Sequence, residues 1–243
     1  MKFLAVGMIV VSLVLAGCVG PQGSGESARA ELRTSSDQTS AQKRAQIRMQ
    51  LAVGYYQQRQ LSVALDEIKQ ALYADPNYAD AYSLRGLIYM DMGEVSLAGD
   101  NLLKAIKLDP RNPDLSNNYG WYLCQNGREQ ESIAYFDAAA RDKSYESPAK
   151  ALNNAGTCSL KLKNETAALS YFMRAFQAEP NDPVVNGNLA KLYYLQKNDE
   201  RARYYLDRAM RRTEHLSADV LWTAIKIEHR AHNTDAEASL INR

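Results

Sequence analysis

The sequence of 243 residues predicts an all-α protein built from about six helix–turn–helix units, the last of them short. Three observations support this prediction. From Ala45 onward the chain resembles itself at intervals of about 34 residues, small residues recur at fixed places in each interval, and proline closes several intervals. With 13 Gly and 7 Pro, the chain also has too few turn-forming residues for a protein of many short strands.

Residues 1–17 have the composition of a secretory signal peptide. Lys2 precedes an uncharged, mostly apolar stretch that ends at Ala16 and is too short to span a bilayer. Ala16 and Gly17 are small enough for a peptidase cleft, and Cys18 follows them directly. This arrangement resembles the bacterial lipoprotein signal, which implies that Cys18 becomes a lipidated N-terminus. The alternative is an ordinary signal peptide with a coincidental cysteine.

Residues 18–44 are expected to form the lipidated cysteine and a flexible tether. They are rich in Gly, Ser, Gln and Thr, so they cannot bury enough apolar surface to fold alone. By the same resemblance, Val19 stands where an Asp would retain a lipoprotein in the inner membrane. The expected location is therefore the periplasmic face of the outer membrane, through acyl chains on Cys18.

Residues 45–243 form the repeated part, with units starting near residues 45, 79, 113, 149, 183 and 217. The eighth position of each unit is small: Ala52, Gly86, Gly120, Gly156, Ala190 and Ala224. The twenty-fourth position is large and apolar: Ile68, Leu102, Phe136, Phe172 and Leu206. A small residue lets the two helices of a unit approach closely, and proline stops the second helix. This pattern is identified as the tetratricopeptide repeat, whose units stack into a superhelix. In the sixth unit, only Thr234 to Arg243 remains for the second helix.

The composition argues against several classes of function. The 29 basic and 28 acidic residues leave no polybasic surface for nucleic acid. His215, His229 and His232 lack the carboxylate or thiol that would complete a metal site, and no phosphate-binding loop or nucleophile motif is present. We therefore expect no enzymatic activity, cofactor, metal, nucleic acid or small-molecule substrate.

Cys124 and Cys158 are the two thiols that remain once Cys18 is lipidated, in a compartment that favours disulfides. They fall in the first helices of the third and fourth units, which are neighbours in the stack. A disulfide between them would join adjacent units and stabilise the fold. The alternative is a pair of buried free thiols.

A candidate binding groove follows from positions two, five, nine and twelve of each first helix. In the first two units these positions are apolar, and in the third and fourth they are mixed. The amides at the sixth position could bind an extended peptide backbone, since each offers a donor and an acceptor. An exposed apolar row would mark a protein-binding site, whereas a register error of one residue would make the row part of the core. The candidate groove residues are Met49, Val53, Tyr56, Leu87, Met90, Asn117, Asn118, Trp121, Lys150, Asn153, Asn154 and Asn188.

Two segments exceed the bare repeat pattern: NNYGWYLC from Asn117 to Cys124, and NNAGTC from Asn153 to Cys158. Together with the lipoprotein start and the six units, they resemble the PilF/PilW family of type IV pilus biogenesis proteins. The resemblance implies a pilotin, which binds the pilus secretin and promotes its outer-membrane localisation and multimerisation. The short sixth unit departs from the family pattern. The alternative is a periplasmic lipoprotein adaptor that organises cell-wall hydrolases or another envelope complex.

Overall fold

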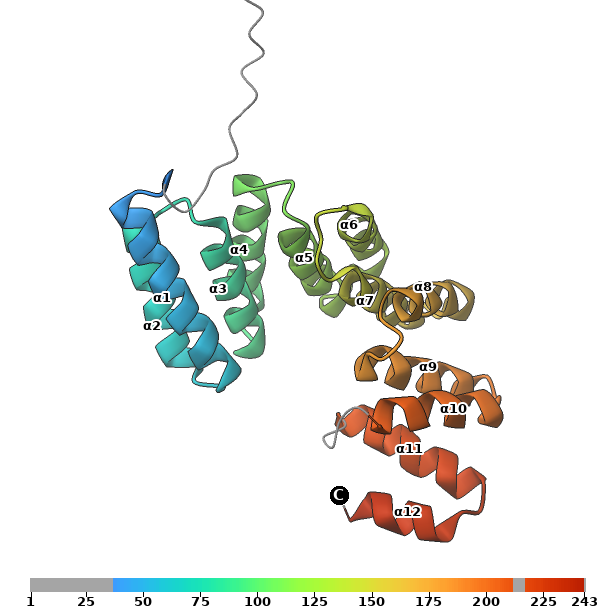
Figure 1. The fold of residues 1–243 in the computed structure, drawn as a ribbon. Coiled ribbons are helices and arrows are strands. Elements are labelled where there is room, and N and C mark those ends of the chain that lie inside the picture. The colour runs from blue at the N-terminus through green and yellow to red at the C-terminus, as the bar shows by residue number, and fades with distance from the viewer. Residues whose placement is uncertain (1–36, 212–216, 243) are drawn as a thin grey trace, which may run out of the picture. The chain divides into compact units, whose positions relative to one another are not determined.

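A computed structural model describes residues 37–211 and 217–242. Cys18, the expected signal peptide and most of the expected tether lie outside the described residues, as does His215. From Gln38 onward the described residues belong to one compact unit, in which they form twelve helices and no strand (Figure 1). The predicted all-α fold class is confirmed.

The helices form six consecutive pairs. The first helices of the pairs are α1 (Ser40–Gln57), α3 (Ala79–Asp91), α5 (Pro113–Gln125), α7 (Pro148–Lys161), α9 (Pro183–Leu195) and α11 (Ala218–Arg230). The second helices are α2 (Leu61–Ala74), α4 (Val95–Leu108), α6 (Glu129–Arg141), α8 (Glu165–Ala178), α10 (Asp199–Met210) and α12 (Thr234–Ile241). The helices of each pair pack against each other, and each second helix also contacts the first helix of the next pair. The short last helix agrees with the sequence.

Small residues bring the two helices of a pair together, as the sequence pattern indicates. A Cβ atom on Gly156 would lie 2.5 Å from the ring of Phe172, and one on Gly86 would lie 2.6 Å from Leu102. Both of these larger side chains are fully buried. The eighth position is therefore small because the large residue at the twenty-fourth position occupies the adjoining space.

Each turn within a pair contains a residue with a positive φ angle. Gly93 and Gly127 fill this position in two turns, at 80° and 79°. The other four described turns use Arg59, Lys163, Lys197 and His232. In three of these the next residue is an asparagine that caps the following helix, since its side chain accepts a hydrogen bond from a backbone N–H. The cap helps to hold a backbone conformation that ordinarily favours glycine.

The repeated part begins earlier than the sequence pattern indicates. Helix α1 starts at Ser40, so residues 40–44 are helical and do not belong to a tether. Thr39 and Gln42 form a capping box: the Thr39 hydroxyl accepts a hydrogen bond from the Gln42 backbone, and the Gln42 side chain accepts one from the Thr39 backbone. The five later first helices begin within one residue of the predicted unit starts.

Candidate protein-binding site

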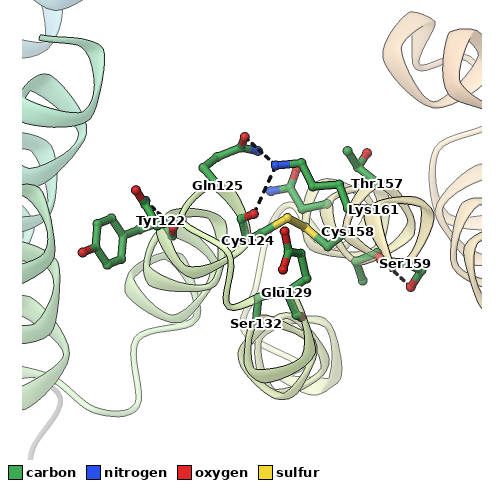
Figure 2. The surroundings of a disulfide bond; sticks show 12 residues. Tyr122, Cys124, Gln125, Glu129, Ser132, Thr157, Cys158, Ser159 and Lys161 are labelled. Carbon is green, nitrogen blue, oxygen red and sulfur yellow. Dashed lines mark hydrogen bonds between the residues drawn. A yellow bond between two sulfur atoms is a disulfide. The ribbon is translucent and has the colours of Figure 1, made fainter. Parts of the chain in front are cut away.

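A disulfide joins Cys124 of α5 to Cys158 of α7 (Figure 2). The two Cα atoms are 5.9 Å apart, which is an ordinary separation for a disulfide, and both cysteines are fully buried. Beside the bridge, the Lys161 ammonium donates hydrogen bonds to the Cys124 carbonyl oxygen at 3.1 Å and to the Gln125 side chain at 2.9 Å. Helices α5 and α7 are thus joined covalently and by hydrogen bonds.

The apolar row of the first two units is partly buried. Met49, Val53 and Tyr56 of α1 pack with one side against the core cluster formed by helices α1 to α5. Leu87 and Met90 of α3 are also partly buried. The row therefore combines the two interpretations left open by the sequence. Met49, Val53, Tyr56 and Met90 pack against core clusters, and all five residues keep part of their surface exposed.

Tyr56 fixes the end of this row to the second unit. Burial, followed by a hydrogen bond to Asp91 and the charge of that carboxylate, raises the pKa of Tyr56 to about 12. Arg59 of the adjoining turn forms an ion pair with the same carboxylate, at 2.6 Å. The surface at the end of α1 and α3 is therefore held by a tyrosine, an aspartate and an arginine.

The asparagines form a ladder between successive first helices. Asn118 donates to Ser83 at 3.1 Å, Asn154 donates to Asn117 at 2.9 Å, and Asn188 donates to Asn153 at 2.8 Å. In each rung a residue at the sixth position of one unit bonds to the fifth position of the unit before it. These amides therefore bond to side chains of the preceding unit. Asn118, Asn154 and Asn188 are also partly exposed, and their binding of a peptide stays a prediction.

The remaining groove candidates are divided between surface and interior. Asn117 and Asn153 are 1% and 8% exposed, so the expectation that they line an open groove is wrong. Trp121 is partly buried and packs against the cluster that contains the disulfide. Lys150 is exposed. Apart from Trp121, the partly exposed apolar candidates thus lie on α1 and α3.

The sequence reasoning missed two exposed apolar residues on α1. Ile47 and Leu51 are 58% and 43% exposed, at the third and seventh positions of the first unit. In the fifth unit the same positions hold Val185 and Leu189, which are 1% and 0% exposed. They are buried there because an earlier unit precedes them, and the described part of the chain has no unit before α1. The signal was present in the sequence as apolar residues at stacking positions of the first unit.

The described residues contain no group of three or more His, Cys, Asp or Glu side chains arranged to hold a metal ion. None of the described helices is long and apolar enough to cross a membrane. Instead, the side chains of the site offer apolar contact area flanked by an ion pair. Such an arrangement can bind part of another protein through its apolar side chains.

The fold and this surface define a tetratricopeptide-repeat scaffold. Tetratricopeptide-repeat profiles match residues 49–113, 83–147 and 159–218. The solved structure of PilW, described as a widely conserved type IV pilus biogenesis factor, is 32% identical and superposes with a TM-score of 0.71, over 81% of this chain and 90% of PilW. The solved structure of Pseudomonas aeruginosa PilF is 27% identical, with a TM-score of 0.72 over 83% of this chain and 90% of that one.

Two curated sequences are also similar. The type IV pilus assembly protein PilF of Pseudomonas aeruginosa is 31% identical over 159 residues, which cover 65% of this chain and 63% of PilF. An uncharacterized protein of Haemophilus influenzae is 27% identical over 117 residues, 48% of this chain and 65% of that protein. The matches span just under two thirds of the length of these two relatives. The chain belongs to the PilF/PilW-like type IV pilus biogenesis proteins.

Proposed function

We propose that this protein is a pilotin: a lipid-anchored scaffold that binds the pilus secretin and promotes its localisation and multimerisation in the outer membrane. The observation that carries the proposal is the 32% identity to PilW over 90% of the PilW chain. An apolar, partly exposed row on α1 and α3 supports a role in binding another protein.

In this proposal, the row of Met49, Val53, Tyr56, Leu87 and Met90 takes apolar side chains of the secretin. The asparagine ladder has a different role, because its amides donate hydrogen bonds to side chains of the preceding unit and hold the first helices in register. Affinity would come from burial of apolar area, at about 25 cal/mol for each Å² removed from water.

The proposed anchor is a lipidated Cys18, which would hold the scaffold at the membrane in which the secretin assembles. Several acyl chains make attachment effectively stable, since each buried methylene contributes about 0.8 kcal/mol. A variant that starts at Gln38 behind a cleavable signal peptide keeps the Thr39 cap of α1 but has no lipid. We expect it to fold and to bind the secretin, and to leave the secretin in the inner membrane. Normal outer-membrane secretin with this variant would exclude the anchoring step.

Deletion of the gene tests the function itself. The proposal expects loss of both pili and heat-stable secretin multimers, with restoration of both by the full chain. Normal piliation together with altered cell-wall cleavage would contradict it and would favour an adaptor of cell-wall hydrolases.

A further inference from the structure

Helix α11 is the first helix of the sixth unit. One face of α11 is exposed, whereas the equivalent face of α9 is covered by the unit that follows it. Helix α11 and the turn after it are offset by 35 residues from α9 and its turn, since the N-caps are Asp182 and Ser217 and the positive φ residues are Lys197 and His232. The buried residues Val220, Ala224 and Ile227 therefore align with Val185, Leu189 and Leu192, and the predicted place of Ala224 at the eighth position is one residue off. Trp222, Lys226 and His229 then correspond to Gly187, Lys191 and Tyr194. Trp222, Lys226 and His229 are therefore the residues of α11 that a helix packed against this face would contact.

All three positions of α9 contact α11. A Cβ atom on Gly187 would lie 2.6 Å from Val220, so the two helices approach closely there. Lys191 forms an ion pair with Asp219 at 2.6 Å. The guanidinium of Arg230 lies 3.7 Å from the centre of the Tyr194 ring. The fifth unit therefore binds the next first helix through a close approach, an acidic residue and a cation–π contact.

The same positions of α11 surround a shallow hollow of about 580 Å³. Trp222 is 56% exposed, and the Lys226 ammonium lies 5.1 Å from the centre of its ring. Ile225, His229 and Tyr194 also line the hollow. An exposed tryptophan next to partly exposed apolar side chains is a typical centre of a protein-binding surface.

The charges around the hollow favour an acidic partner. Arg230 is paired with Asp199 at 2.7 Å, and a His229 ring nitrogen lies 3.1 Å from Glu237. Among the described residues, no carboxylate lies within ion-pair distance of Lys226, whereas Lys191 at the equivalent position of α9 has Asp219. A partner that supplied a carboxylate would complete the same ion pair one unit further on.

We propose that the face of α11 formed by Trp222, Lys226 and His229 docks an amphipathic helix of a partner protein, on the side where α9 is followed by α11. Because Trp222 stands where Gly187 permits a close approach, this helix lies further from α11 than α11 lies from α9. The helix carries an acidic residue for Lys226 beside an apolar residue that covers Trp222, as Asp219 and Val220 are adjacent on α11. This surface lies at the opposite end of the array from α1 and α3, so the inference is independent of the proposed secretin site.

A pair of stapled helical peptides tests the proposal on the whole mature chain in mild detergent. Both are 16 residues long with leucines on one face, and they differ only in an Asp or a Lys beside the first leucine. Fluorescence anisotropy should show at least tenfold tighter binding of the Asp peptide. Trp222→Ala should weaken this binding at least tenfold, and Lys226→Glu should reverse the preference between the peptides. Tyr73→Ala removes a ring that is 88% exposed on α2 and should change nothing.

Equal affinity for the two peptides, or a preference that Lys226→Glu leaves unaltered, would overturn the proposal. Lys226 is exposed, so its substitution keeps the test valid even if Trp222→Ala were to unfold the last unit. Sedimentation equilibrium supplies a further outcome. Self-association that Trp222→Ala abolishes would identify a second copy of the chain as the occupant and would also overturn the proposal.

Discussion

Removal of the disulfide should lower the stability of the repeat array substantially. The bridge between Cys124 and Cys158 spans a sequence separation of 34 residues. In the chain-entropy model, closing a loop of this length lowers the entropy of the unfolded chain enough to stabilise the fold by about 3.8 kcal/mol at 25 °C. Both cysteines are fully buried, so alanine is the suitable replacement, because serine would place unpaired hydroxyl groups in the interior.

The double variant Cys124→Ala/Cys158→Ala should therefore unfold at a midpoint roughly 10 °C lower, given about 2–4 °C for each kcal/mol in a domain of this size. Circular dichroism during heating measures the midpoint. The reductant TCEP supplies the control: it should lower the midpoint of the wild-type chain and leave that of the double variant unchanged. Thiol alkylation of the denatured, unreduced wild type should label neither cysteine.

Alkylation of both cysteines without reduction would exclude the disulfide. Melting of the double variant within about 2 °C of the wild type would contradict the stabilisation expected from the bridge. In the first case the thiols are free, and in the second the bridge does not restrict the unfolded chain as the loop length requires.

Three further predictions concern the packing of the units, and urea unfolding measures the first two. Gly156→Ala should destabilise the fold by about 1–3 kcal/mol, since its Cβ atom would lie 2.5 Å from an aromatic ring. At Gly54 a Cβ atom would have nothing within 4 Å, so Gly54→Ala should stabilise helix α1 by about 0.5–1 kcal/mol, and equal effects of the two variants would contradict the close approach at Gly156. Asn154→Ala should lower the free energy of unfolding by about 1–3 kcal/mol, because it leaves the side-chain carbonyl of Asn117, a residue only 1% exposed, without its donor. An unchanged midpoint would show that the asparagine ladder does not stabilise the fold. The raised pKa of Tyr56 means that folding favours its protonated phenol, so the stability of the fold should fall as pH rises from about 10 to about 12. In thermal melts at stepped pH, Tyr56→Phe should lose less stability than the wild type over this range, and identical losses would show that Tyr56 does not titrate with unfolding.

The fold could be predicted because the repeat places strict demands on individual positions. Position 156 must be small because the large ring of Phe172 occupies the space next to it. Residue type indicates a positive φ angle only where glycine occupies the turn, at Gly93 and Gly127. Lys163 also has a positive φ angle, and the cap formed by the following Asn164 helps to hold it. The residue type of Lys163 does not indicate such an angle.

The candidate site was predicted less completely, because period alone gives the direction of a side chain and not the distance to its neighbours. The recurrence of asparagine singles out Asn154, yet its partner Asn117 lies 37 residues earlier and meets it only through the stacking of two units. The exposure of Ile47 and Trp222 depends on the absence of a neighbouring unit within the described chain. Such end effects require knowledge of where the stack begins and ends.

One pair of variants tests the proposed capture of the secretin by the row on α1 and α3. Leu87→Glu places a charge on the partly exposed row, while Leu103→Glu places the same charge on α4, where the side chain is 37% exposed. Affinity capture of the pilus secretin from detergent-solubilised envelopes is the measurement, with thermal melts to verify folding. We expect Leu87→Glu to lose the secretin and Leu103→Glu to retain it, both with nearly unchanged melting. Equal capture by the two folded variants would contradict it.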